Sequence, residues 1–140
     1  MSDVTPDLIQ AYKDAYYCVF IKEKRFDLRI GEKSEFLQSL CVETGSKSAL
    51  FITAFNPEGI AHPSNENIKF QRELGDIAAN IADLIFEGEG GDPSGIWPPE
   101  QSYLIIGVDR STSVGLGKRF RQNAILWIGS DYIPELVMLR

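Results

Sequence analysis

The sequence predicts an α/β fold in a single domain, residues 1–140, with a mixed sheet of about six strands and helices on both faces; an α+β fold is the alternative. Three nearly continuous apolar runs, Ala49–Phe55, Tyr103–Val108 and Ala124–Ile128, are typical of central strands that are covered on both faces. Segments with helical spacing separate these runs, and this alternation favours a mixed sheet with helices packed on it. One domain is expected at this length, because 44% of the residues are hydrophobic and 24% are charged.

The N-terminal part of the chain predicts a helix followed by a hairpin. Thr5 is suited to the N-cap of a helix, and Pro6 to its first turn. Apolar residues then alternate with other residues in Tyr17–Ile21 and in Phe26–Ile30, which is the period of half-buried strands. A short charged segment, residues 22–24, separates the two strands and predicts a turn between them.

Two further helices are predicted in the middle of the chain. The segment Ser34–Glu43 carries apolar residues one helical turn apart, with Ser34 as its cap and Gly45 after its end. The longest helix is expected to begin near Ser64, which is suited to the cap. Its apolar stripe continues to Ile85, and Gly88 is expected to end it.

The C-terminal part predicts a long loop, a helix and a final strand. Residues 87–100 are rich in glycine and proline, which indicates a loop, and Ile96–Trp97 is expected to anchor that loop to the core. A helix is expected over Ser111–Arg121, with Asp109 as its cap. The apolar segment Leu136–Leu139 predicts the last strand.

Composition argues against several classes of function. The formal net charge of −6 argues against nucleic acid as a partner, because phosphate binding needs a basic surface. The N-terminus lacks a signal-peptide pattern, and no apolar run approaches about 20 residues. We therefore expect a cytoplasmic protein with no membrane contact. With one histidine, His62, and two cysteines, Cys18 and Cys41, outside any CxxC motif, we expect neither a metal site nor a cofactor.

Blocks along nearly the whole chain resemble one uncharacterised bacterial family, domain of unknown function 3293. The most specific blocks are Thr53–Pro57 and Gln122–Ala124. Other matching blocks are Ala11–Tyr16, Leu28–Gly31, Trp97–Leu104 and the segment that begins at Gly117. At Arg121 we would expect a small residue such as glycine, and at Phe55 a tryptophan as often as a phenylalanine. The resemblance implies a stand-alone protein of similar size and transfers no activity.

The first group of candidate ligand-binding residues lies after the first buried run. Thr53 and Asn56 follow that strand, and ligands of open α/β sheets bind at the carboxyl ends of strands. Ser64 and Asn67 begin the long helix, whose N-terminus favours an anion. The alternative interpretation is local: Asn56 makes a turn before Pro57, and Ser64 caps a helix.

The second group of candidates lies before the third buried run. Four basic residues and no acidic one occur in Arg110–Arg121, whereas Glu73–Asp109 contains eight acidic residues and no basic one. Arg119 and its basic neighbours are suited to bind a phosphate or a carboxylate, or alternatively to complete a helix C-terminus. Gln122 and Asn123 begin a buried strand, so at least one of these amides needs a partner inside the fold. We expect Asn56, Asn67 and Gln122 to form one hydrogen-bonded cluster.

Two functional hypotheses remain open at this stage. In the first, Thr53, Asn56, Asn67, Arg119 and the amides Gln122 and Asn123 form a polar, cationic pocket for a small anionic ligand. The glycine-rich segment Gly88–Trp97 would then act as its lid. In the second, the acidic surface binds a basic protein partner, as an inhibitor or immunity-type module would. Glu100, Asp109 and His62 are the candidates for acid–base chemistry, but no motif decides whether the protein is an enzyme.

Overall fold

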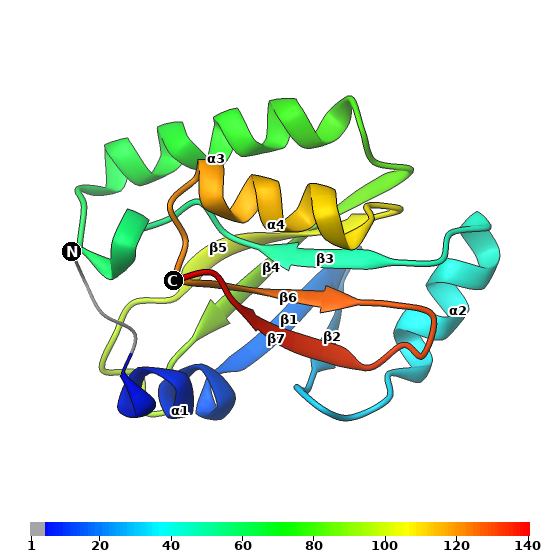
Figure 1. The fold of residues 1–140 in the computed structure, drawn as a ribbon, viewed down its shortest axis with the longest axis horizontal. Helices are drawn as coiled ribbons and strands as arrows, with labels where there is room; N and C mark the ends of the chain where they lie inside the picture. Colours follow the sequence, from blue (N-terminus) through cyan, green and yellow to red (C-terminus); the bar gives the residue numbers. More distant parts are fainter. Residues whose placement is uncertain (1–4) are drawn as a thin grey trace.

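The computed structural model describes residues 5–140 as a seven-stranded sheet with four α-helices (Figure 1). The strands are β1 (Tyr16–Ile21), β2 (Lys24–Leu28), β3 (Ala49–Ile52), β4 (Leu84–Gly91), β5 (Glu100–Ile106), β6 (Ala124–Ile128) and β7 (Pro134–Met138). The helices are α1 (Pro6–Asp14), α2 (Glu35–Thr44), α3 (Ser64–Ala79) and α4 (Arg110–Arg119), and Pro57–Gly59 forms a short 3₁₀ helix.

The fold is α+β, the alternative that the sequence left open, and the sheet is antiparallel rather than mixed. Its strand order is β2-β1-β4-β5-β3-β6-β7, and every neighbouring pair is antiparallel. The helical connections β3-α3-β4 and β5-α4-β6 do link strands that run in the same direction. An antiparallel strand lies between the two strands of each connection, so no parallel neighbours arise. This is the split βαβ, or ferredoxin-like, arrangement.

Strand β4 was not predicted from the sequence, and it corrects the predicted end of the long helix and the predicted loop that follows it. Helix α3 ends at Ala79 rather than near Ile85, and Leu84–Gly91 is a strand between β1 and β5 rather than a helix end and a loop. Glycines in β4 serve close packing here. A Cβ atom at Gly88 would lie 2.6 Å from the backbone oxygen of Cys18, on the neighbouring strand.

The other strands occur where the sequence predicted them, with shifted ends. The hairpin is confirmed as β1 and β2, and the third apolar run forms β6 within the predicted bounds. Strand β3 ends at Ile52 rather than Phe55, and β5 begins at Glu100. Ile52, Ile105 and Leu126 are 2%, 0% and 2% exposed, as expected for core residues.

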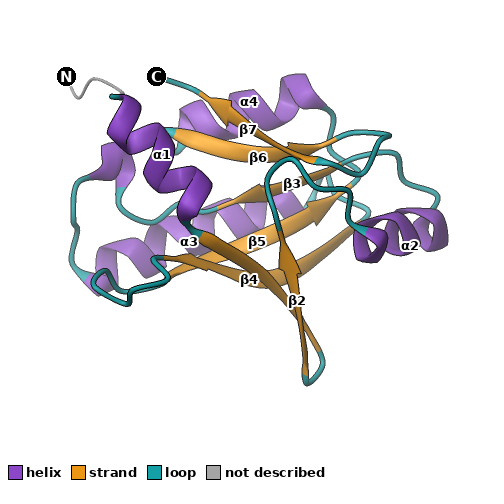
Figure 2. Ribbon diagram, turned by 90° about the horizontal axis from the view of Figure 1, so that it is seen from below, coloured by secondary structure: helices purple, strands orange, loops and turns teal. Residues whose placement is uncertain are grey.

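Helices cover both faces of the sheet, as predicted. On one face, α3 and α4 pack on Leu50, Ile105 and Ile125 (Figure 1). On the other face, α2 packs on the residues that alternate with these, among them Leu104 and Ile106 (Figure 2). Because successive side chains of a strand point to opposite faces, a strand between two helical layers is apolar throughout.

Helix caps follow the sequence in three of four helices. The side chains of Thr5, Ser34 and Asp109 accept hydrogen bonds from backbone amides in the first turns of α1, α2 and α4. Helix α3 departs from the prediction: Ser64 is its first residue, and Pro63 stands at the N-cap without a side-chain hydrogen bond. The prediction that Ile96–Trp97 anchors the loop before β5 to the core is wrong, since these side chains are 76% and 70% exposed.

Candidate functional site

The turn after β3 is held by the side chain of Thr53, in the turn itself, and by that of Gln71, on α3. The Thr53 hydroxyl donates to the backbone oxygen of Gln101 at 2.6 Å and accepts from the amide of Phe55 at 3.0 Å. The Ala54 amide donates to the side-chain oxygen of Gln71, on α3, at 2.8 Å. At Asn56 the backbone is left-handed, with φ of 49°, which asparagine tolerates better than most residues. Thr53 and Gln71 thus fix the chain that positions Asn56.

Asn56 and Asn67 bind each other in both directions. Asn67 Oδ1 accepts from the Asn56 backbone amide at 2.8 Å, and Asn67 Nδ2 donates to Asn56 Oδ1 at 2.8 Å. The loop that leads into α3 joins them, because the His62 amide donates to Asn56 Oδ1 at 3.0 Å. Asn67 is only 4% exposed. These bonds use the backbone amide and the Oδ1 atom of Asn56, so its Nδ2 group remains available to donate to another partner.

That partner is the carboxylate of Glu100, at the start of β5. Asn56 Nδ2 donates to Glu100 Oε2 at 2.8 Å. The side chain of Glu100 is half-buried. Burial raises the pKa of Glu100 from its ordinary value, and the hydrogen bond from Asn56 only partly opposes this rise. Glu100, one of the acid–base candidates, is therefore a partly dehydrated carboxyl in a fixed orientation.

Tyr12 and Asn123 complete this polar group. The hydroxyl of Tyr12 lies near enough to the Asn123 side chain and to Glu100 for both groups to affect its pKa. Burial raises the pKa of Tyr12; the Asn123 amide opposes the rise, and the charge of Glu100 adds to it. Asn123 is 5% exposed, and its Oδ1 atom has no hydrogen-bond partner among the described residues. We call Tyr12, Asn56, Asn67, Glu100 and Asn123 the Glu100 cluster.

The cluster lies at one end of the sheet. The turn after β3, the start of α3 and the loop before β5 meet at that end, next to α1 (Figure 1). Helix α1 is attached there by a hydrogen bond of 2.5 Å from the Tyr17 hydroxyl to the backbone oxygen of Tyr12. None of the residues of α1 is fully buried, so this helix covers the cluster without entering the core.

Gln122 is joined to the cluster through the backbone rather than through side chains. Its Nε2 atom donates to the backbone oxygens of Phe55 and Phe120, at 3.1 and 3.2 Å. The predicted three-amide cluster therefore holds in part: Asn56 and Asn67 bond directly, and Gln122 holds the residue that precedes Asn56. Gln122 supports the turn, whereas the side chain of Asn123, the next residue, lies near the Tyr12 hydroxyl.

The basic run is spread over the surface around α4. Arg110 pairs with Glu135 at 2.7 Å, and Arg121 pairs with Glu58 at 3.3 Å. Arg119 is exposed in the last turn of α4, with no ion pair among residues 5–140. At Arg121, where the resemblance led us to expect a small residue, φ is +53°, a conformation that glycine adopts without strain. None of these basic residues belongs to the Glu100 cluster, in which Glu100 is the one acidic or basic side chain.

The segment predicted as a lid is only partly a loop. Gly88 to Gly91 belong to β4, which leaves residues 92–99 as the connection to β5. Two grooves occur elsewhere: one between the β1–β2 hairpin, α2 and β4, and one beside α1 and β2. None of the six predicted ligand-binding residues lines either groove. Among residues 5–140, His, Cys, Asp and Glu side chains form no group of three suited to a metal ion.

Sequence reasoning missed Tyr12 as a site residue and weighed Glu100 without its partners. Tyr12 is 111 residues away from Asn123 along the chain, and Glu100 is 44 residues from Asn56. The only available signal was an acidic residue at the start of a buried strand.

No helix in the described part of the chain is long and apolar enough to cross a membrane.

The comparisons with known proteins agree with the resemblance seen in the sequence. No curated protein and no solved structure matches the chain. One family model matches residues 52–125, more than half of the chain, and its description is "protein of unknown function (DUF3293)". The match runs from the end of β3 to the start of β6 and includes every member of the Glu100 cluster except Tyr12. The chain belongs to the DUF3293 family.

Proposed function

We propose that this protein binds a small polar ligand at the Glu100 cluster, through hydrogen bonds that the ligand donates. The observation that carries the proposal is that two acceptors lie near the Tyr12 hydroxyl: the half-buried carboxylate that Asn56 orients, and a buried amide oxygen, Asn123 Oδ1, that no described residue satisfies. An unpaired buried acceptor costs about 1–3 kcal/mol. Such a cost is typical of sites where stability is given up for function.

The chemistry of the cluster defines the ligand class. Glu100 and Asn123 Oδ1 both accept hydrogen bonds, so the complementary ligand carries N–H or O–H groups. Amines, amides and sugar hydroxyls meet this requirement. Burial shifts the pKa of Glu100 upward, in the direction that favours acid–base work, and this shift supports Glu100 as a group that exchanges a proton with the ligand.

An anionic ligand, as predicted from the basic run, is the second candidate. The exposed Arg119, with no ion pair among residues 5–140, supports it. The negative charge of Glu100 argues against an anion inside the cluster itself. An anion would therefore bind at the surface near the end of α4 and would depend on Arg119.

Thermal-shift measurements with a compound panel test the proposal. The panel contains small amines, amides, sugars and nucleosides on one side, and inorganic phosphate and organic acids on the other. We expect a compound of the first group to raise the melting temperature, and Asn123→Ala and Glu100→Gln to abolish the shift. The control is Glu87→Gln, an exposed carboxyl of β4 outside the cluster, which should leave the shift unchanged.

Three other outcomes would redirect the assignment. Stabilisation by phosphate that is lost in Arg119→Ala would favour the anionic ligand. Stabilisation that survives both cluster variants would place the ligand elsewhere. If no compound of either group shifts the melting temperature, the acidic surface around Glu73–Asp109 and a basic protein partner become the better explanation.

A further inference from the structure

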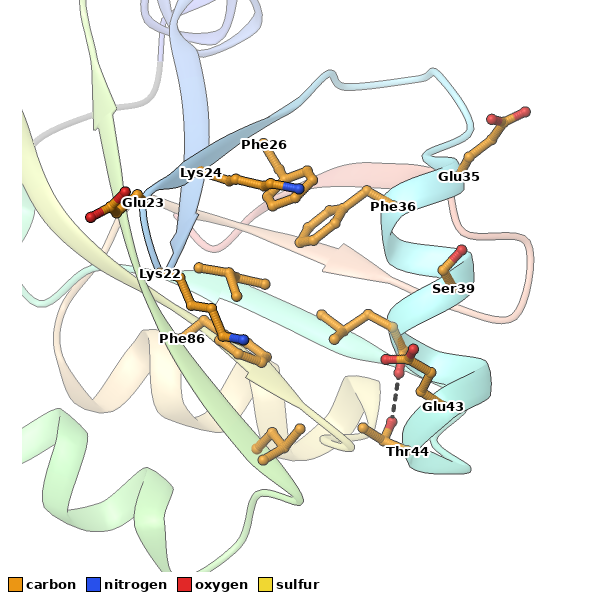
Figure 3. Close-up of a pocket in the computed structure, with 13 residues that line it drawn as sticks. Lys22, Glu23, Lys24, Phe26, Glu35, Phe36, Ser39, Glu43, Thr44 and Phe86 are labelled. Carbon is orange, nitrogen blue, oxygen red and sulfur yellow. Dashed lines mark hydrogen bonds between the residues drawn. The ribbon is translucent and has the colours of Figure 1, made fainter.

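The groove between the β1–β2 hairpin, α2 and β4 has a volume of about 1080 Å³ and shares no residue with the Glu100 cluster (Figure 3). Its apolar lining comes from all of these elements: Ile21, Phe26, Phe36, Leu40, Leu84 and Phe86. This volume lies slightly above the range typical of small-molecule pockets, roughly 300–1,000 Å³. The groove is thus large enough for a ligand with an extended apolar part.

The groove exists because α2 covers only part of its face of the sheet. The buried cluster beneath α2 centres on β3, β5 and β6. On β4, toward the hairpin, Leu84 is 42% exposed and Phe86 is half-buried. The rings of Phe26 and Phe36 stack with their centroids 4.2 Å apart and bridge from β2 to α2. This leaves a walled apolar surface that opens to solvent.

Two lysines give this apolar surface a positive end. Lys22 and Lys24 extend from the hairpin across the groove toward α2, whereas Glu23, between them, points away (Figure 3). Neither lysine takes part in an ion pair among residues 5–140. Glu35 and Glu43 stand on the opposite bank, on α2. The positive charge is therefore concentrated on the hairpin side.

We propose that this groove binds an anionic amphiphile, with an acyl chain on the apolar floor and a carboxylate head at Lys22 and Lys24. The charge arrangement places the head at the hairpin, since an anion is attracted by the two lysines and repelled by Glu43. The floor also disfavours an extended peptide: its residues are apolar, and the Thr44 hydroxyl already donates to the backbone oxygens of Leu40 and Cys41. An acyl chain needs no hydrogen bonds there.

Titration calorimetry with laurate, below its micelle-forming concentration, tests this proposal. We expect saturable binding of one laurate per chain, and binding of dodecyltrimethylammonium, which has the same chain length, weaker by at least about tenfold. The double variant Lys22→Glu/Lys24→Glu should reverse this preference. Leu84→Glu, which places a charge on the groove floor, should weaken laurate binding by at least about tenfold.

Controls separate the groove from general surface binding. Val42→Glu changes an exposed apolar residue of α2 that does not line the groove and should leave laurate binding unchanged; Lys69→Glu is the matching control for the lysines. Equal binding of both amphiphiles, equal losses in Val42→Glu and Leu84→Glu, or no saturable laurate binding would overturn the proposal. Light scattering that shows a dimer, dissociated by Leu84→Glu, would overturn it too, because a second copy would then fill the groove.

Discussion

At the scale of single residues, the Glu100 cluster combines satisfied and unsatisfied polar groups. Asn67 makes hydrogen bonds through both of its side-chain polar atoms and holds Asn56 in place. Glu100 and Asn123, by contrast, carry acceptor capacity that the fold does not use fully. The satisfied amides hold the unsatisfied groups in position, which is the arrangement that a binding site requires.

Replacing Glu100 by glutamine should make the protein more stable at pH 7. Burial raises the pKa of Glu100 above its ordinary value of 4.5, so the ionised form weakens the folded state. Between the two pKa values the folded state binds more protons than the unfolded state, and stability falls as the pH rises through that window. Glutamine carries no charge and keeps an oxygen for Asn56.

Urea unfolding at pH 7 and at pH 4 provides the measurement. The advantage of Glu100→Gln should be largest at pH 7 and should shrink at pH 4, where the carboxyl of the parent protein takes up its proton. Glu87→Gln, at an exposed position, is the matched control and should change little at either pH. A Glu100→Gln protein that is destabilised equally at both pH values would contradict a burial effect.

Gln122→Ala should lower the free energy of unfolding by about 1–3 kcal/mol. The side chain is 7% exposed and donates to two backbone oxygens, and alanine leaves both acceptors without that donor. Chemical denaturation measures the loss, with Gln101→Ala at an exposed position as the control. A neutral or stabilising Gln122→Ala would instead indicate that Gln122 belongs to the ligand-binding surface.

At the scale of elements, β4 shows how glycine can mislead a reading of local sequence. Gly88, Gly90 and Gly91 suggested a loop, yet they lie in a strand that pairs along both sides with β1 and β5. Glycine favours turns when a positive φ is required, but it also permits close approach between strands. Only the neighbouring strand reveals which of these two roles applies.

Gly88→Ala should destabilise the protein by about 1–3 kcal/mol more than Gly90→Ala. A Cβ at Gly88 would lie 2.6 Å from the Cys18 backbone oxygen and 2.9 Å from the Phe51 ring, so the strands must shift. At Gly90 the nearest atom, in the Tyr17 ring, is 3.5 Å away, which is an ordinary contact. Thermal unfolding of the two variants decides the matter; equal losses would show that β4 tolerates a side chain at both sites.

At the scale of the whole molecule, one sheet separates two apolar layers. Leu50 and Ile105 face α3 and α4, whereas Phe51 and Leu104 face the layer of α2. Strands β3 and β5, at the centre of the arrangement, contribute to both layers. The stability of the two layers is therefore coupled through the same backbone ladders.

Ile105→Ala should cost about 2–5 kcal/mol, since it opens a cavity at a fully buried position of β5. Ile60→Ala, where the side chain is 58% exposed in a loop, is the control and should change stability far less. Denaturant midpoints of the two variants supply the comparison. Midpoints that move equally would place Ile105 outside the core.

The sequence by itself determined the local structure and the burial of most elements. The apolar runs placed Ile52, Ile105 and Leu126 in the core, and Thr5, Ser34 and Asp109 marked helix starts. These predictions hold because hydrophobic periodicity and helix capping depend on neighbours within one or two turns of the chain. Thr53 and Asn56 were singled out because they follow a buried strand, and Asn123 because it stands at the start of another.

Tertiary structure alone decided the strand order and the composition of the site. Strand β4 is a strand because β1 and β5 satisfy its backbone on both sides, and its own residues carry no comparable local signal. Glu100 becomes a constrained carboxyl only where Asn56 donates a hydrogen bond to it. Contacts between residues this far apart depend on how strands pair and helices pack. The short-range patterns of the sequence predicted the pairing of β1 with β2, which a turn joins directly, but not the pairing of strands that are separated by helices.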